Sequence, residues 1–418
     1  MAVLRKTEIK KNICLLLIII MVMVLPGCWS KAEPKDISII NSSFYDVQDG
    51  IYEAVVEVMN PSGAAGTQQA ASTNENPYII FSGEGPSLVE ALNDLTVSLD
   101  RTLFAGQNQT RFFSERFAKT SMRIALEYFT REHQTSETPL VIIVKGENPK
   151  DIYNCQIGLA NTTGDYFNSL QKHQPNTISN SVFVTLINFI KDYYIEGKQP
   201  VAGVAEVLPC ELKQPGSSAS GSQGSQAGRA NLANAQNKIR YEGLAAFKNG
   251  SLVGFMNGTE TRAYNIITGN DKESYVSVAS GDGQAVVKII KSTADIKTAF
   301  KSGEAVLDVK IKCTTGIVQE SGTTEISKIG GAKTVEQSVN KQLLTEIAQS
   351  VKKAQQEFQS DIFGFGTYMH AQHPDKWKEI RENWDDYFSK ATVNISVESS
   401  VIRSGEIKEP FIIKDKML

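Results

Sequence analysis

The chain has 418 residues, of which 41% are hydrophobic and 21% charged, which is enough material for two or three globular domains. Its formal net charge is −3, and because the basic leader described next carries +3, the remainder carries −6. No cluster of Lys and Arg interrupts this mildly acidic balance. Since phosphate binding needs such clusters, the composition argues against nucleic acid as a partner.

The start of the chain has the pattern of a lipoprotein signal peptide. Basic residues open it, and residues 13–25 then carry no charge, a run shorter than the ~20 residues of a membrane-spanning helix. Leu25, Pro26 and Gly27 precede Cys28 in the order of a lipobox. We therefore expect residues 1–27 to be removed and Cys28 to carry a lipid anchor on the outer face of the cytoplasmic membrane. An uncleaved N-terminal anchor helix is the alternative.

Three cysteines remain once Cys14 leaves with the leader and Cys28 takes the lipid. Cys155, Cys210 and Cys313 are too widely spaced for a disulfide framework or a zinc site. The pattern favours buried thiols, with a single bridge between Cys155 and Cys210 as the alternative.

Residues 28–210 read as an N-terminal α+β domain, which could subdivide. Ser87 and Glu90 form a capping box ahead of a helix that ends near Arg101. Patterns of alternation and periodicity predict strands at 37–44, 52–59, 78–83, 139–145 and 201–208, and further helices at 122–129 and 182–194.

Residues 211–237 consist mostly of Ser, Gly, Gln, Ala and Asn. Such a segment lacks the apolar residues that offset the entropy of ordering, so we predict a linker or long surface loop.

Residues 238–418 read as a second α+β domain. Asn249-Gly250 predicts a type I′ hairpin, and the helix opened by Thr334 and Gln337 carries a long apolar stripe. The stripe consists of Val335, Val339, Leu343, Ile347, Val351, Ala354, Phe358 and Ile362. Further predicted elements are a helix at 259–267, an amphipathic helix at 377–388, and strands at 275–279, 284–291, 305–314 and 392–402. The whole chain is therefore expected to be α+β, with several mixed sheets flanked by helices.

No catalytic constellation emerges from the sequence. Ser338 and Ser350 each begin an S-x-x-K match, but no K-T-G follows, so we interpret both as chance on a Lys-rich helix face. His370 and His373 lack a third metal ligand at a recognised interval, which favours solvated surface residues. We expect a binding or scaffold protein without enzymatic activity, metal or cofactor.

The stretch from 361 to 388 combines glycines with large aromatic residues. Phe363, Phe365, Trp377 and Trp384 are amphipathic anchors of the kind enriched at interfaces, so we predict that they contribute to partner docking. The alternative is that they belong to the core and that Gly364 and Gly366 mark a helix stop.

An ordered set of motifs resembles the Ger(x)C family, the lipoprotein C subunits of spore germinant receptors. The strongest is the run from Ser360 to Gly366 followed by His373-Pro374, Trp377-Lys378 and Trp384. The others are Cys28-Trp29, Phe104-Ala105-Gly106-Gln107, Phe113-Ser114-Glu115, Arg131-Glu132, Lys145-Gly146, Ala246-Phe247-Lys248, Leu252-Val253-Gly254 and Val401-Ile402-Arg403-Ser404-Gly405. They span nearly the whole mature chain in the family's order.

The resemblance implies a mixed α/β architecture of several domains and a non-enzymatic structural and signalling subunit. Such a subunit is lipid-anchored on the outer face of the spore inner membrane. It works there with a transporter-like B subunit and a membrane-embedded A subunit in the response to nutrients.

Two other functions stay open at this point. An extracytoplasmic solute-binding lipoprotein of a transporter would need two Rossmann-like lobes of alternating strands and helices, which the strand-rich runs fit poorly. An extracytoplasmic hydrolase would need a nucleophile constellation.

Overall fold

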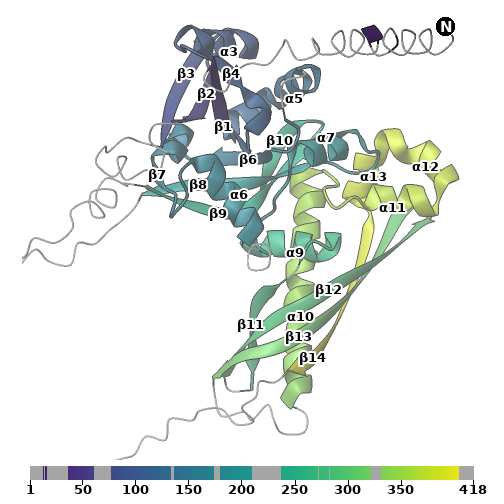
Figure 1. Ribbon diagram of the computed structural model, residues 1–418. Coiled ribbons are helices and arrows are strands. Elements are labelled where there is room, and N and C mark those ends of the chain that lie inside the picture. Colours follow the sequence, from purple (N-terminus) through teal and green to yellow (C-terminus); the bar gives the residue numbers. More distant parts are fainter. Residues whose placement is uncertain are drawn as a thin grey trace, which may run out of the picture.

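The computed structural model describes residues 13, 15–16, 36–60, 77–132, 136–173, 179–209, 237–271, 273–281, 283–321 and 331–403. Within them the chain forms two β-sheets with helices packed against both (Figure 1). The predicted α+β class with mixed sheets and flanking helices is confirmed.

The first sheet contains ten of the described strands. They are β1 (Ile37–Gln48), β2 (Ile51–Met59), β3 (Tyr78–Gly85), β4 (Thr102–Phe104), β5 (Thr110–Ser114), β6 (Leu140–Lys145), β7 (Cys155–Gln156), β8 (Val201–Pro209), β9 (Asn237–Lys248) and β10 (Ser251–Met256). Eight follow the order β10-β9-β8-β6-β5-β1-β2-β3, while β4 pairs with β1 and β7 with β9. The central strands β1, β5, β6 and β8 are parallel, and antiparallel strands extend the sheet on both sides.

Helices cover both faces of this sheet. One face carries α3 (Leu88–Val97), α4 (Glu115–Thr120), α5 (Met122–Arg131) and α7 (Leu186–Tyr194), and the other carries α6 (Thr163–His173) and the 3-10 turn η5 (Pro149–Asn154). Neighbouring residues of β5 show this division, because Phe113 packs with Phe117 while Phe112 packs with Phe167. The central strands are therefore buried on both faces, as their continuous apolar runs require.

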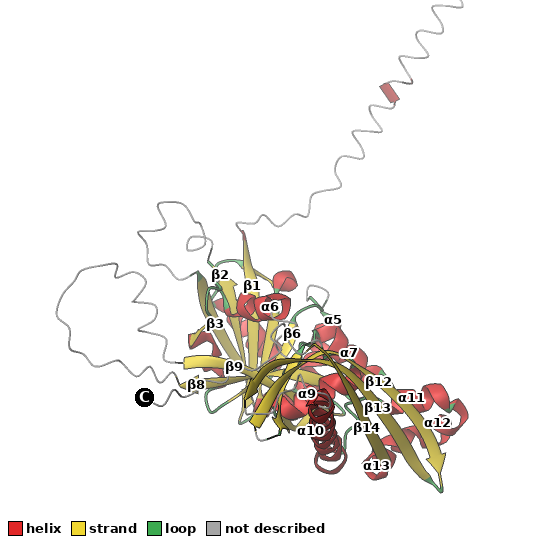
Figure 2. Cartoon of the chain, turned by 90° about the horizontal axis from the view of Figure 1, so that it is seen from below, coloured by secondary structure: helices red, strands yellow, loops and turns green. Residues whose placement is uncertain are grey.

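The second sheet lies beside a single long helix. Its strands are β11 (Ser274–Ser280), β12 (Gly283–Lys301), β13 (Glu304–Ser321) and β14 (Thr392–Arg403), in that order, with only β14 parallel to its neighbour. These strands curve around α10 (Gly331–Lys353), which Figure 2 shows nearly end-on. All eight residues of the predicted apolar stripe are buried, but α10 ends at Lys353, so Ala354, Phe358 and Ile362 lie beyond it.

The chain after α10 differs from its prediction. A π-helical turn, η6 (Ala354–Phe358), is followed by α11 (Phe365–Gln372), α12 (Pro374–Ile380), the 3-10 turn η7 (Arg381–Asn383) and α13 (Trp384–Lys390). The predicted single helix at 377–388 is thus two short helices joined by a 3-10 turn. Pro374 cannot donate to a preceding turn, so it starts α12 instead of continuing α11.

Several local predictions hold in detail. Ser87 Oγ accepts the Glu90 backbone N–H, and Asn249 and Gly250 both have positive φ between β9 and β10, as a type I′ turn requires. Helix α7, in contrast, begins at Leu186 and not at Val182. Residues before it are extended, and Val141 N–H donates to the carbonyl of Val184.

The first sheet does not stop at the predicted linker. Strands β9 and β10 lie beyond it in the sequence, yet β9 pairs with β8 from Val201↔Ala246 to Pro209↔Asn237. The predicted domain boundary at residue 238 therefore differs from the structure, in which the strand order of the first sheet continues to Met256. Strand pairing overrides the compositional boundary because β8 needs a neighbour for its backbone donors and acceptors. Residues 210–236 lie outside the described residues.

Candidate functional site

The predicted lipidation site lies outside the described residues. This applies to Leu25, Pro26, Gly27 and Cys28 alike. Among the helices that the structure describes, none combines the length and the apolar character needed to cross a bilayer.

The four aromatic residues predicted to dock partners are core residues. Phe363, Phe365, Trp377 and Trp384 expose between 0% and 4% of their surface. Phe365 packs on Phe363, and the indoles of Trp377 and Trp384 lie 5.4 Å apart. The docking prediction is wrong for these side chains, because one chain already buries them and leaves no ring surface for a partner; the core alternative holds.

Asp361 organises the loop that carries the glycines. Its carboxylate accepts the backbone N–H groups of Gly364, Phe365 and Gly366, and the indole N–H of Trp384 at 2.9 Å. Burial raises the pKa of Asp361 to about 6, although these donors act in the lowering direction. Gly364 has φ +79°, a backbone conformation that favours glycine. The loop between η6 and α11 is therefore fixed by one buried carboxylate.

The connector between α7 and β8 packs on this loop. Gln199 N–H donates to the Asp361 carbonyl at 2.9 Å, and Trp377 donates its indole N–H to Glu196 Oε2. The Trp377 hydrogen bond lowers the pKa of Glu196. A Cβ added to Gly366 would lie 2.5 Å from the Gly197 Cα, so the two backbones approach closely. The family-like motif thus joins the second part of the chain to the first.

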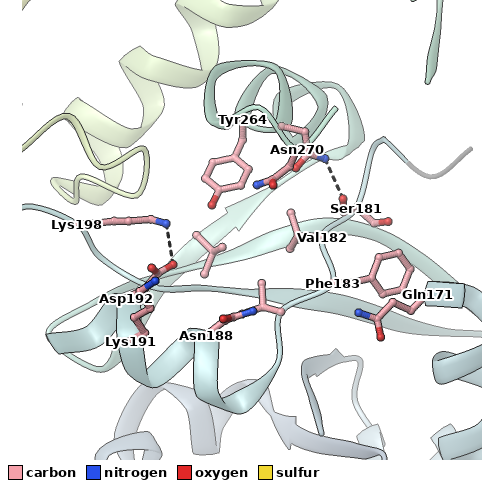
Figure 3. Close-up of a pocket in the computed structure, with 13 residues that line it drawn as sticks. Gln171, Ser181, Val182, Phe183, Asn188, Lys191, Asp192, Lys198, Tyr264 and Asn270 are labelled. Carbon is pink, nitrogen blue, oxygen red and sulfur yellow. Dashed lines mark hydrogen bonds and ion pairs between the residues drawn. The ribbon is translucent and has the colours of Figure 1, made fainter. Parts of the chain in front are cut away.

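A pocket of about 460 Å³ opens beside this junction (Figure 3). Its lining comes from α6, the extended segment before α7, α7 itself, the following connector, β8 and α9 (Gly258–Thr268). The lining residues are Gln171, Ser181, Val182, Phe183, Val184, Asn188, Lys191, Asp192, Lys198, Val201, Tyr264, Asn265 and Asn270. The pocket therefore lies where the two parts of the chain meet, a preferred position for ligand sites.

Charged groups gather on one side of the pocket. Lys198 Nζ lies 2.8 Å from Asp192 Oδ2, with both side chains about one-fifth exposed. Tyr264 is 3% exposed, and burial and then the Asp192 charge raise the pKa of its hydroxyl, which stays protonated as a donor. On the opposite side, Asn265 donates to the carbonyls of Ser179 and Ser181 and holds the extended segment in place.

Ser350, His370 and His373, which were considered for catalysis or metal binding, make structural contacts. Ser350 Oγ donates to the Glu260 carbonyl, and Lys353 pairs with the Glu260 carboxylate at 2.9 Å. His370 stacks on Trp377, and a ring nitrogen of His373 lies 2.7 Å from the Thr298 carbonyl oxygen. The described residues contain no group of three or more His, Cys, Asp or Glu side chains arranged to hold a metal ion.

Cys155 and Cys313 are buried free thiols, and burial raises the pKa of each to about 12. The predicted burial of these two residues is confirmed. Cys210 lies outside the described residues, so the alternative bridge to Cys155 stays a prediction.

Sequence reasoning missed a buried carboxylate on the first sheet. The alternation in β2 assigns Glu57 to a polar face, but it is fully buried under α6. It accepts from Ser42 Oγ and from the backbone N–H groups of Thr163 and Gly164 at the N-terminus of α6. Burial raises its pKa, and these hydrogen bonds oppose the shift. The burial of Glu57 could have been predicted only from the position of β2 in a sheet that helices cover on both faces.

Both parts of the chain match known protein families. Residues 30–207 match a family described as spore germination protein N-terminal domain, and residues 242–405 match the C-terminal family of spore germination B3/GerAC-like proteins. A crystal structure of the GerBC protein resembles the fold with a TM-score of 0.50 and 16% identity, covering 86% of this chain and 96% of that one.

Two relatives match this chain along nearly their whole length. Spore germination protein KC of Bacillus subtilis (strain 168) is 21% identical over 96% of this chain and 98% of its own length. Spore germination protein B3 of the same organism is 19% identical over 93% of this chain and 96% of its own length. Both matched regions of the chain are thus those of spore germination proteins. The chain belongs to the Ger(x)C family.

Proposed function

We propose that this chain is the lipoprotein C subunit of a spore germinant receptor and is needed for nutrient-triggered germination. The observation that carries the proposal is the similarity to spore germination proteins KC and B3, which extends over more than nine-tenths of the chain. The lipobox at Leu25 to Cys28 supports a lipid anchor on the outer face of the spore inner membrane.

The subunit acts as a structural and signalling component, not as an enzyme. One hydrophobic cluster includes Val201 and Leu244 of the first sheet together with Leu343 and Phe365 of the second part. Because the two parts share one close-packed core, they move together as a rigid body. A displacement imposed by one partner can therefore reach another partner. Its partners in this proposal are a transporter-like B subunit and a membrane-embedded A subunit.

The alternative function, a solute-binding lipoprotein of a transporter, fits the structure less well. That class needs two lobes of alternating strands and helices around a parallel sheet. Here the first sheet takes strands from both sides of the linker, and the second sheet is built on the long antiparallel pair β12 and β13.

Replacing Cys28 with Ala tests the anchor and the function together. Without a thiol to acylate, the protein is expected to leave the spore membrane fraction, and the germination rate in nutrients should fall severalfold. Cys14→Ala, which changes the other cysteine near the leader's apolar run, is the matched control and should alter neither readout. Normal germination with a fully soluble Cys28→Ala protein would overturn the role of the lipid, and normal germination of spores lacking the chain would overturn the receptor assignment.

A further inference from the structure

Exposed apolar side chains gather at the place where β1 begins. Single apolar residues on a surface need no explanation, but a group of neighbouring ones marks a contact surface. This group comes from the end of β2, the start of β3, the end of α3 and the end of β4. We call it the apolar rim, and its members are Met59 (38% exposed), Ile79 (46%), Ile80 (38%), Val97 (83%) and Phe104 (36%).

Strand pairing places the rim residues of three strands side by side. Phe104 of β4 pairs with Ile39, near the first residue of β1. On the other side of β1, the end of β2 pairs with the start of β1, and Met59 pairs in turn with Tyr78, the neighbour of Ile79 in β3. Since adjacent strands lie about 5 Å apart, these side chains are within roughly 10 Å of β1.

Helix α3 brings Val97 to the same end of the sheet. A Cβ added to Gly85 would meet Glu90 near the start of the helix, and one added to Gly83 would meet Leu95 near its end. Helix α3 therefore runs antiparallel to β3. Its last residue, Val97, lies toward the start of β3, where the rim residues of that strand are.

The lipid anchor proposed above reaches this same end. Cys28 precedes Ile37, the first residue of β1, by nine positions. A chain spans at most about 3.3–3.6 Å per residue, so Ile37 lies within about 30 Å of the bilayer surface once Cys28 is acylated. Figure 2 shows β1, β2 and β3 at one side of the molecule and α10, α12 and α13 at the other. The anchor therefore keeps the side that carries the rim next to the membrane.

The charges near the rim balance one another. Residues 29–36 contain two lysines, one glutamate and one aspartate, so they add no net charge. After the end of α3, Arg101 Nε lies 3.7 Å from Asp100 Oδ2, which pairs these two charges. A contact between the rim and lipid thus depends on apolar area and does not require anionic headgroups.

We propose that the apolar rim rests on the lipid bilayer when Cys28 is acylated, with its side chains at the boundary between headgroups and acyl chains. The contact fixes the orientation of the first sheet on the membrane and leaves the second sheet directed away from it. This contact rests on the lipid anchor of the proposed function, and the anchor and the contact can be measured separately.

The lipidated full-length protein in phosphatidylcholine vesicles, without any other protein, tests the contact. Val97→Cys and Phe104→Cys each carry a nitrobenzoxadiazole label in the rim. Tyr275→Cys and Leu344→Cys are the controls, because these side chains are exposed on the second sheet and on α10.

The native cysteines allow such single labels. Cys155 and Cys313 are buried free thiols, and Cys28 is occupied by the lipid. Cys210→Ser, introduced in all four proteins, removes the remaining thiol of the mature chain.

Nitroxide-bearing lipid quenches a label that touches the bilayer. Labels at positions 97 and 104 should lose roughly half or more of their fluorescence, because a contact at the headgroup boundary buries apolar groups by about 5–10 Å. Labels at positions 275 and 344 should keep theirs. Flotation of the vesicles reports the anchor. Protein that floats but whose four labels respond alike overturns the contact and leaves the anchor intact, whereas protein that does not float overturns both.

A matched pair of valine variants shows whether the rim, and not the label, makes the contact. Val97→Asp places a charge at the interface and should reduce the quenching of the label at position 104 severalfold. Val318→Asp changes a valine of the second sheet that is 59% exposed and should leave the quenching unchanged. Circular dichroism confirms folding of both variants. Unchanged quenching in folded, floating Val97→Asp protein overturns the assignment of the rim.

Discussion

Two buried carboxylates, Glu57 and Asp361, organise this protein at the level of single residues. Each collects backbone N–H groups that would otherwise be unpaired: Glu57 at the start of α6, and Asp361 in the loop before α11. A charged acceptor is the strongest partner for such donors. Both residues therefore fix the backbone around them.

Asp361→Asn should destabilise the protein by about 3 kcal/mol. The amide keeps the shape of the side chain but turns an NH₂ group toward backbone N–H groups that need an acceptor. Chemical denaturation measures the effect, with Asp295→Asn as the exposed control that should change stability by less than about 0.5 kcal/mol. Equal stability of the two variants would mean that the carboxylate does not hold the loop.

Asp271 should make stability depend on pH. Burial raises its pKa from 3.8 to about 6; Ser274 and Ser292 only partly oppose this shift, and neither carboxylate oxygen accepts a hydrogen bond of normal geometry among the described residues. Because the folded state then holds the proton more tightly than the unfolded state, this contribution is fully present below about pH 4. It is lost as the pH rises through about 6.

Asp271→Asn removes that dependence. Relative to the wild type, the variant should gain on the order of 2 kcal/mol between pH 4 and pH 7.5. Denaturation curves at both pH values measure the difference. Parallel pH profiles for the two proteins would show that the Asp271 carboxyl is solvated.

At the scale of elements, α10 is held by one stripe of side chains against the second sheet. Leu343 and Leu344 are chemically identical neighbours, but Leu343 is 0% exposed and Leu344 is 40% exposed. Leu343→Ala should cost about 2–5 kcal/mol, because it removes buried contacts and leaves a cavity, whereas Leu344→Ala should cost less than about 1 kcal/mol. Thermal denaturation compares the two, and similar losses would mean that α10 does not pack as described.

Elements with strong local signals could be predicted, and those set by distant contacts could not. The stripe of α10 and the turn at Asn249-Gly250 depend on a few neighbouring residues, so the sequence identifies both. Strand β12 extends ten residues beyond its predicted end at Lys291, because its pairing with β13 continues to Lys301↔Glu304. The burial of Trp377 and Trp384 likewise depends on the Asp361 loop and on a connector nearly two hundred residues earlier in the chain.

The pocket illustrates the same limit for the candidate site. Lys198 and Tyr264 are 66 positions apart and belong to no recognised motif. Both line the same pocket. The Gln199 backbone N–H, next to Lys198, donates a hydrogen bond to the Asp361 carbonyl, and Phe363 packs on Tyr264. No spacing rule applies to residues that are brought together by a third segment of the chain.

At the scale of the whole molecule, the two regions that match the family do not fold as two independent domains. The family match breaks between residues 207 and 242, but β8 and β9 pair across that interval, and Leu244 and Phe247 of β9 are fully buried. The first sheet therefore depends on residues from both regions. Cutting the chain between them removes a covalent bond without removing the strand pairing.

A recognition site for a sequence-specific protease, placed within residues 216–226, tests this dependence. After cleavage, the two fragments should elute together in size-exclusion chromatography under native conditions, because separation would expose the edge of β8 and the apolar residues of β9 to water. In denaturant they should separate. Independent elution in native buffer would show that the sheet ends at the linker, as the composition alone had indicated.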